Sequence, residues 1–403
     1  MTQVLRTLYS VTISTLMAGR PKRRRLNPDG FLTQHTELMK VDKASWKGFC
    51  EIESEPALFN VMLEEFGVNG VKVQEVVSLD DEMLQSLNKP MYGLIFLFRW
   101  REDDPIKQEQ SCPNTLWFAN QTVNYACASV ALLNIVNNVT EVDLGEHLRA
   151  FKDFTMGFTP ALRGDAISNF EFIKETHNSF ARGMDILSID LQLKNDTTSK
   201  KSRIGKRNQI YDESAAGFHF IAFVPVNGKY VGGDWLDLAK PEIQSRMAEY
   251  EEDQIEFSIL SLARDPIFGL VHQLAVNVKS LAAVEDQLRD RHSIHNIEPC
   301  DGATVTGPDS SFNLTAHILD GARVSEDDID SYKSASKDIL LDLRKVLLDV
   351  QREIRLSIKE EQQTRDADQG YARKRRHDYG PAVYKWVQIL ASKGLVECLA
   401  EEM

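Results

Sequence analysis

One cysteine of this 403-residue chain lies where a reactive thiol is expected. Apolar residues between positions 124 and 137 have the spacing of a helix that packs inward, and Cys127 falls in its first turn. Free backbone N–H groups and the positive dipole end of a helix stabilise a thiolate there. A cysteine in an alanine-rich helix is more often a small core residue, so a nucleophilic role requires suitable partners.

A predicted hairpin supplies a histidine and a carboxylate as such partners. A thiolate nucleophile needs a general base that later protonates the leaving amine, and that base needs an orienting acceptor. Residues 218–226 alternate as a strand, Asn227-Gly228 is a favourable two-residue turn, and residues 229–235 form the returning strand. We expect His219 on the first strand to be the base and Asp234 on the second to orient it.

The register of this hairpin decides which carboxylate can orient the histidine. His219 would oppose Leu236, which makes Asp234 its diagonal neighbour on the same face. Asp237 lies three residues further on and would point to the opposite face of the strand. Gln121, in the loop before Cys127, could direct its amide N–H at an oxyanion forming beside the sulfur, although an ordinary loop glutamine is the simpler alternative.

No metal or cofactor is expected. His177 is interpreted as a structural, hydrogen-bonded residue, and His292 with His295 lacks the neighbouring cysteines or acids of a zinc site. Glycine-rich phosphate loops are absent from the sequence. Five scattered cysteines are too few for a disulfide framework and suit a reducing compartment.

Composition narrows the class of protein. With 42% hydrophobic and 27% charged residues, most of the chain should fold. A net charge of −13 argues against nucleic acid as the main partner. No run approaches the roughly 18 apolar residues of a spanning helix, so we expect no membrane segment. The basic cluster at residues 22–25 leaves a nuclear address, an organelle presequence and an unstructured tail as alternatives.

Helices and strands are predicted to alternate around the candidate residues. Ser54 is expected to cap a helix whose first turn contains Pro56. Other predicted elements are a buried strand at 91–100, helices at 144–154 and 166–177, and a long, mostly polar loop at 194–216. After Pro266 the pattern changes to long helices. A heptad seam there predicts a helix that packs against a partner: Leu340, Leu343, Leu347, Val350 and Ile354.

Three segments carry a resemblance to a known family: residues 117–128, 177–182 and 218–228, which read WFANQTVNYACA, HNSFAR and FHFIAFVPVNG. Together they resemble the ubiquitin C-terminal hydrolases, a family of cysteine deubiquitinases with the same order of Gln, Cys, His and Asp. The resemblance covers about residues 46–266.

The resemblance implies an α/β fold of the papain-like type, with a central, mostly antiparallel sheet flanked by helices and a C-terminal helical extension. It implies hydrolysis of the bond after ubiquitin's C-terminal glycine, without a cofactor. Cys127 would attack, Gln121 would help to hold the oxyanion, His219 would carry the proton and Asp234 would orient it. In this family a glycine usually follows the aspartate, whereas Trp235 follows Asp234 in this chain. Residues 194–216 would cross the catalytic cleft and limit which leaving groups pass.

The C-terminal part resembles one subgroup of that family. Residues 373–379 (RKRRHDY), followed by an amphipathic helix, are similar to the tail of deubiquitinases that dock on the proteasome or on a chromatin adaptor; a solvated helix face is the alternative for the basic run. We expect a basic, disordered segment (1–43), a catalytic domain (44–266), a helix and linker (267–330) and a helical docking extension (331–403).

Ubiquitin or its conjugates are therefore the expected substrates. The leading hypothesis is a deubiquitinase recruited to a proteasome receptor subunit and present in nucleus and cytoplasm. Alternatives are a nuclear, histone-directed deubiquitinase of a chromatin complex, and a catalytically weak ubiquitin-binding scaffold. A structural coiled-coil adaptor is a third interpretation, but it would explain only residues 331–359 and not the first domain.

Overall fold

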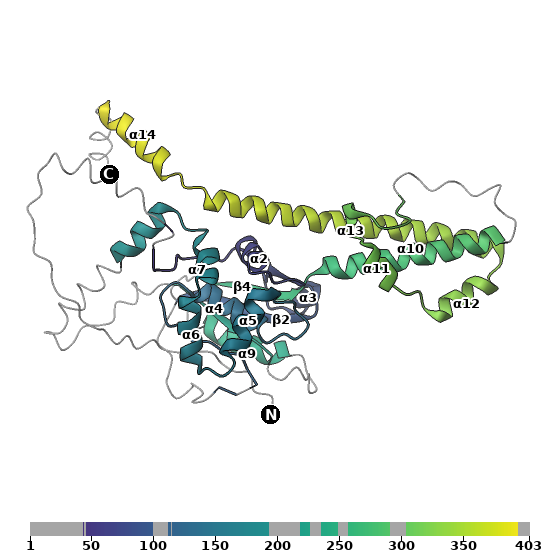
Figure 1. Cartoon of the computed structure of the whole chain (residues 1–403), viewed down its shortest axis with the longest axis horizontal. Coiled ribbons are helices and arrows are strands. Elements are labelled where there is room, and N and C mark those ends of the chain that lie inside the picture. Colours follow the sequence, from purple (N-terminus) through teal and green to yellow (C-terminus); the bar gives the residue numbers. More distant parts are fainter. Residues whose placement is uncertain are drawn as a thin grey trace, which may run out of the picture. The chain divides into compact units, whose positions relative to one another are not determined.

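The computed structural model describes residues 43, 46–99, 112–113, 115–192, 218–225, 235–248, 257–290 and 304–393 (Figure 1). The chain divides into two compact units. The first contains residues up to 263 together with residues 368–403, and the second contains residues 264–367. Residues 368–403, which the sequence assigned to the docking extension, therefore group with the first unit.

A four-stranded sheet forms the centre of the first unit. Its strand order is β1 (Val71–Glu75), β4 (Ser258–Arg264), β2 (Met91–Arg99) and β3 (Phe218–Phe223). Strand β2 pairs antiparallel with both β3 and β4. Its side chains are buried nearly throughout because both faces of the sheet are covered. The expected mostly antiparallel sheet and the strands near 91–100 and 218–226 are thus confirmed.

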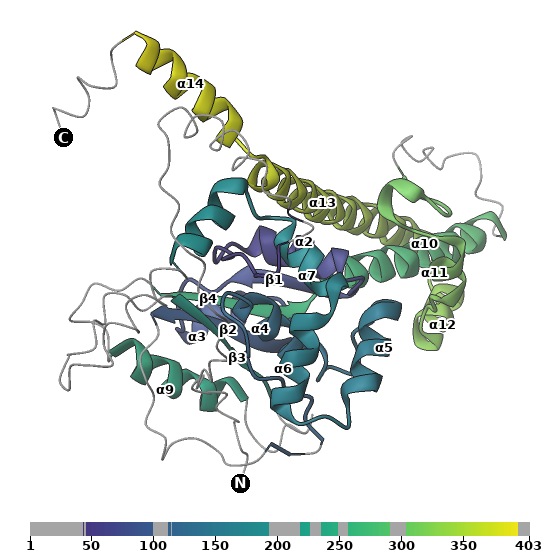
Figure 2. The ribbon, with the colours of Figure 1, turned by 60° about the vertical axis from the view of Figure 1, so that its left-hand side comes forward.

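Helices pack on the two faces of this sheet (Figure 2). In chain order they are α2 (Pro56–Glu65), α3 (Asp81–Ser86), α4 (Cys127–Val136), α5 (Gly145–Thr155), α6 (Pro160–Asn169), α7 (Glu171–Asn178) and α9 (Trp235–Ala248), with a further helical stretch at 183–192. Every residue of α4 is buried. A helix that is apolar all round belongs inside a fold, and α4 accordingly packs against β2 and β3.

Three local predictions were wrong. Glu55, not Ser54, is the N-cap of α2, and the Ser54 hydroxyl instead hydrogen-bonds the Ser258 hydroxyl at 2.7 Å. The single helix expected at 166–177 is two helices, because Phe170 has an extended backbone and packs against the core. Trp235 begins α9 and does not end a returning strand. Residues 226–234, including the predicted turn, lie outside the described part of the chain.

The second unit is built on two long helices. They are α10 (Pro266–Asp290) and the part of α13 (Lys337–Arg376) up to residue 367, with η5 (Ser310–Phe312), α11 (Ala316–Gly321) and α12 (Glu326–Ser334) between them. Leu340 packs with Val284 and Leu288 of α10, and Ile354 packs with Leu274. The predicted heptad helix is confirmed, and α10 of the same chain covers much of its seam. The sequence did not predict this pairing, because a heptad pattern indicates that one face of a helix is covered but does not identify the residues that cover it.

Helix α10 is long and apolar enough to cross a membrane by length and composition, and half of its most apolar window is buried in the structure. Core helices of folded domains have the same composition. Val271 and Leu274 of α10 belong to such a core in the second unit.

The segment that leads to Cys127 is fixed by side chains and has no strand partner. Asn134 on α4 brackets Ala119: its Oδ1 accepts from the Ala119 N–H at 2.9 Å, and its Nδ2 donates to the Ala119 carbonyl at 3.1 Å. Asn138, one turn later, brackets Trp117 in the same way. The buried guanidinium of Arg163 donates to the carbonyls of Leu116 and Phe118. Nearly all backbone groups of this buried stretch thus have partners without a sheet.

Glycine is required where α6 meets the next part of this segment. A Cβ atom on Gly164 would lie 2.0 Å from the carbonyl oxygen of Asn120 and 2.9 Å from Cγ2 of Thr122. Real Cβ atoms never approach backbone atoms so closely, so α6 and the loop that carries Gln121 pack without an intervening side chain.

A buried histidine anchors the N-terminal segment beneath α4. His177 Nε2 lies 2.7 Å from the Cys50 carbonyl oxygen, which can only accept, so this nitrogen carries the proton. Nδ1 then accepts from the Ser129 hydroxyl at 2.7 Å. Burial lowers the pKa of His177 to about 4, so the ring is neutral at pH 7. The structural role expected for His177 is the one that the contacts support.

We predict that His177 makes the protein sensitive to acid. The unfolded chain binds a proton near pH 6.5, whereas the folded chain binds it only near pH 4. Stability is therefore fully present above pH 6.5 and lost as the pH falls towards 4, by about 3 kcal/mol in total. Urea unfolding at a series of pH values measures this slope, and His177→Gln should flatten it. An equally steep slope in that variant would contradict the assignment.

We also predict that Gly164→Ala lowers the free energy of unfolding by about 2 kcal/mol, because the loop at Asn120 must move to admit the methyl group. Gly157→Ala is the matched control, since a Cβ there meets nothing within 4 Å. Chemical denaturation of both variants checks the difference; equal stability of the two would show that the loop yields freely.

Candidate active site

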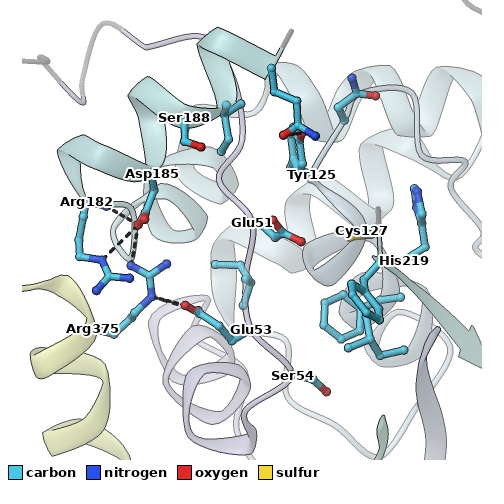
Figure 3. A pocket seen from close by; sticks show the side chains of 17 residues that line it. Glu51, Glu53, Ser54, Tyr125, Cys127, Arg182, Asp185, Ser188, His219 and Arg375 are labelled. Atoms are coloured by element: carbon cyan, nitrogen blue, oxygen red, sulfur yellow. Dashed lines mark hydrogen bonds and ion pairs between the residues drawn. The ribbon is translucent and has the colours of Figure 1, made fainter. Parts of the chain in front are cut away.

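Cys127 and His219 line one pocket of about 510 Å³ (Figure 3). Its walls come from residues 51–54, the start of α4, the helical stretch 183–192, strand β3 and the end of α13. Segments from distant parts of the sequence thus converge on one thiol and one imidazole.

Cys127 is the first residue of α4, as predicted, and is only 9% exposed. Burial raises its pKa to about 11, although hydrogen bonds with the backbone of Phe220 and Ala128 act in the opposite direction. The thiol is therefore protonated in the free protein at neutral pH. It reacts as a nucleophile only if a neighbouring base takes the proton.

His219 is the candidate for that base, and it lies on β3, where it pairs with Phe98 of β2 and precedes Phe220. Because Phe220 interacts with the Cys127 thiol through its backbone, the histidine is one residue away from a direct contact of the sulfur. Burial lowers the pKa of His219, which favours the neutral ring that can accept a proton.

Of the two carboxylates considered as the orienting group, the structure describes Asp237. Asp234 lies outside the described residues. Leu236 and Asp237 lie on helix α9, so the strand register that placed Leu236 opposite His219, and the argument from strand parity against Asp237, were both wrong. Asp237 is nevertheless exposed and does not line the pocket. Its position gives it no access to His219 through that pocket.

Gln121 is held close to the site but outside the pocket lining. Its Nε2 donates to the Val123 carbonyl at 2.9 Å, which leaves the second hydrogen of the same amide for another acceptor. Between Gln121 and the nucleophile, Tyr125 has a φ of 65°, a left-handed conformation that is costly for a bulky residue. This tight turn lets α4 begin at Cys127.

Sequence analysis missed the charged wall of the pocket. Glu51, Glu53, Asp185 and Arg375 all line it, together with Arg182. Residues 51 and 53 are near neighbours, as are residues 182 and 185, but these two pairs and Arg375 lie far apart in the sequence, and no local pattern joins them. The basic run at 373–376 was the single available signal.

The sequence of this chain is similar to those of known proteins. Residues 49–242 match the family described as ubiquitin carboxyl-terminal hydrolase, family 1. The chain is 36% identical to ubiquitin carboxyl-terminal hydrolase ubh-4 of Caenorhabditis elegans, over 55% of this chain and 68% of that protein. It is 33% identical to ubiquitin carboxyl-terminal hydrolase isozyme L5 of Dictyostelium discoideum, over 64% and 76%.

A solved structure, Trichinella spiralis UCH37 bound to ubiquitin vinyl methyl ester, aligns with 27% identity over 61% of this chain and 90% of that chain, at a TM-score of 0.43. The family match covers Cys127, His219 and every other residue that lines the pocket except Arg375. The chain therefore belongs to the ubiquitin carboxyl-terminal hydrolase family, the cysteine-type ubiquitinyl hydrolases.

Proposed function

We propose that Cys127 cleaves the bond after the C-terminal glycine of ubiquitin, with His219 as proton carrier, Asp234 as its orienting carboxylate and Gln121 as oxyanion donor. The observation that carries this proposal is the convergence of Cys127 and His219 on one pocket from α4 and β3.

The reaction begins with proton transfer from the Cys127 thiol to the neutral ring of His219. The thiolate attacks the carbonyl carbon of ubiquitin's last residue, and the oxyanion of the tetrahedral intermediate accepts a hydrogen bond from Gln121. The imidazolium returns its proton to the leaving amine as the carbon–nitrogen bond breaks. Water, deprotonated by His219, then hydrolyses the thioester and frees the enzyme. The first turn of α4 stabilises the negative sulfur during these steps.

Cys127→Ala and His219→Ala should each abolish release of a fluorophore from the C-terminus of ubiquitin, because one removes the nucleophile and the other the proton carrier. Both variants should still bind ubiquitin. Turnover by Cys127→Ala above a trace rate would show that another thiol is responsible.

The same assay separates the two candidate carboxylates. Asp234→Asn should lose most activity yet remain measurable, since it costs alignment of the ring and not the proton carrier itself. Asp237→Asn is its matched control and should behave like the wild type, because Asp237 is exposed on α9 and away from the pocket. A larger loss in Asp237→Asn than in Asp234→Asn would reverse the assignment.

We further propose that helix α14 (Gly380–Ser392) recruits the enzyme to a proteasome receptor subunit. Val383, Trp386 and Val387 are 52%, 63% and 45% exposed and are spaced by three and one residues, so they form one apolar stripe. An exposed apolar stripe of this kind supports docking on an apolar groove. Action in nucleus and cytoplasm would follow from such recruitment.

A nuclear, histone-directed role on a chromatin adaptor is the second candidate, and the exposed basic residues Arg373 and Lys374 near the end of α13 favour it. A catalytically weak ubiquitin-binding scaffold is less well supported, because both a thiol and an imidazole line the pocket.

Affinity purification of the full chain should recover proteasome subunits with the wild type and lose them with Trp386→Ala. Lys385→Ala is the matched control, since it changes an exposed neighbour outside the apolar stripe. Ubiquitin hydrolysis without a partner should be equal in all three proteins. Recovery of chromatin factors in place of proteasome subunits would replace the first candidate by the second.

A further inference from the structure

The last turn of α13 contributes an arginine to the wall of the active-site pocket (Figure 3). The Arg375 side chain is only 9% exposed. Its Nε donates to both carboxylate oxygens of Glu53, at 2.7 and 3.0 Å. Its Nη1 donates to Asp185 Oδ2 at 2.7 Å and to the Phe180 carbonyl at 2.8 Å. Few surface arginines are so fully engaged, and charge-assisted contacts of this kind are among the strong ones.

These contacts join two segments that line the pocket. Glu53 belongs to the extended segment that precedes α2, whereas Asp185 belongs to the helical stretch 183–192. Ser188, Ile189 and Gln192 of that stretch also line the pocket, on the same helix face as Asp185. Two sets of described contacts join these segments: the Arg375 guanidinium at this end of the pocket, and further along the hydrogen bond that the Trp46 indole N–H donates to Asp190 Oδ1 at 3.3 Å. The guanidinium therefore helps to set the separation of the segments where they line the pocket.

The positive charge of the Arg375 guanidinium also offsets the negative charges of the carboxylates that line the pocket. Burial raises the pKa of Glu51, and the charges of Glu53 and Asp185 raise it further. Burial alone would raise the pKa of Asp185 as well, but hydrogen bonds from the Arg182 backbone and from Arg375 outweigh it and keep the carboxylate ionised. Without Arg375, the charges of Glu53 on the same segment and of Asp185 on the helix would act on Glu51 with less compensation.

Neighbouring residues hold Arg375 in this place. Ala372, one turn earlier, is completely buried in the core of the first unit. The Arg376 guanidinium lies over the Phe180 ring, 4.5 Å from its centroid, and pairs with Glu65 at 2.7 Å. Asp378 accepts from the Gly183 N–H at 3.0 Å. Arg375 therefore lies on a segment whose neighbouring residues are packed against the first unit.

We propose that Arg375 is a positioning residue for ubiquitin hydrolysis: it ties the Glu53 segment to the Asp185 helix and so fixes the width of the pocket that receives the substrate chain. The inference rests on the proposed function, because it takes this pocket as the one that binds ubiquitin's C-terminus. Arg375 touches neither the Cys127 thiol nor the described part of the proton path, so its effect should fall on substrate binding and not on chemistry.

Steady-state hydrolysis of a ubiquitin–coumarin amide by the full chain tests this assignment. Arg375→Ala should raise KM about tenfold and change kcat less than about twofold. Arg375→Lys should restore part of the loss, since an ammonium can pair with one wall but cannot span both in the same geometry. Arg373→Ala is the matched control, because it removes the same charge from an exposed position on the same turn of α13.

Two further measurements exclude a merely structural effect. The rate at which iodoacetamide alkylates Cys127 should be the same in wild type, Arg375→Ala and Arg373→Ala. Glu53→Gln combined with Arg375→Ala should raise KM less than the product of the two single effects, because both changes break one interaction. If Arg375→Ala does not fold, Asp185→Asn, which keeps the shape of the side chain, takes its place.

The outcomes separate this inference from the function on which it rests. Equal KM values for Arg375→Ala and Arg373→Ala, or a loss confined to kcat, would overturn the role of Arg375 alone. Turnover by Cys127→Ala in the same assay would overturn the proposed function itself.

Discussion

The position of Cys127 depends on one set of hydrogen bonds, those that three side chains make to the backbone of residues 116–119. Asn134 and Asn138 satisfy both backbone groups of Ala119 and Trp117, and Arg163 satisfies the carbonyls of Leu116 and Phe118. Leaving one such buried group without a partner costs about 1–3 kcal/mol. The segment can therefore lie against α4 in one place only, and the turn at Tyr125 follows from that place.

Helix α4 is itself held in one position relative to the rest of the first unit. Because all its side chains are buried, it cannot rotate or slide without breaking contacts with β2, β3 and the N-terminal segment. Beneath it, His177 links Ser129 of α4 to the Cys50 carbonyl. Cys50 stands immediately before Glu51, the first residue of the pocket wall, so the same core that fixes the thiol also fixes one side of the substrate site.

Local patterns in the sequence were sufficient for elements whose neighbours are also local. The strand at 91–99 and the helix at 127–136 were predicted because a buried run and a helical apolar period are properties of single segments. The predicted returning strand was wrong at its last residue: Trp235 begins a helix, and with Leu236, Ala239 and Ile243 it is buried against α3 and β2. The turn at Asn227-Gly228 and residues 229–234 lie outside the described part of the chain. At Trp235, tertiary packing overrode the local signal.

Contacts between distant residues left no pattern to find. Arg375 and Glu53 are separated by 322 positions, and the run at 373–376 is equally typical of a solvated helix face. In the structure that run divides: Arg375 and Arg376 turn inward, while Arg373 and Lys374 are exposed. Family resemblance supplied the candidate catalytic residues, but it did not indicate that the end of α13 builds part of their pocket.

The burial of Cys127 also has a consequence for oxidation. Peroxides attack thiolates far faster than thiols, and sulfenic acid formation begins the route to irreversible inactivation. A sulfur with a pKa of about 11 presents almost no thiolate to solvent in the resting protein. Burial therefore holds Cys127 in a form that resists oxidants in the resting protein.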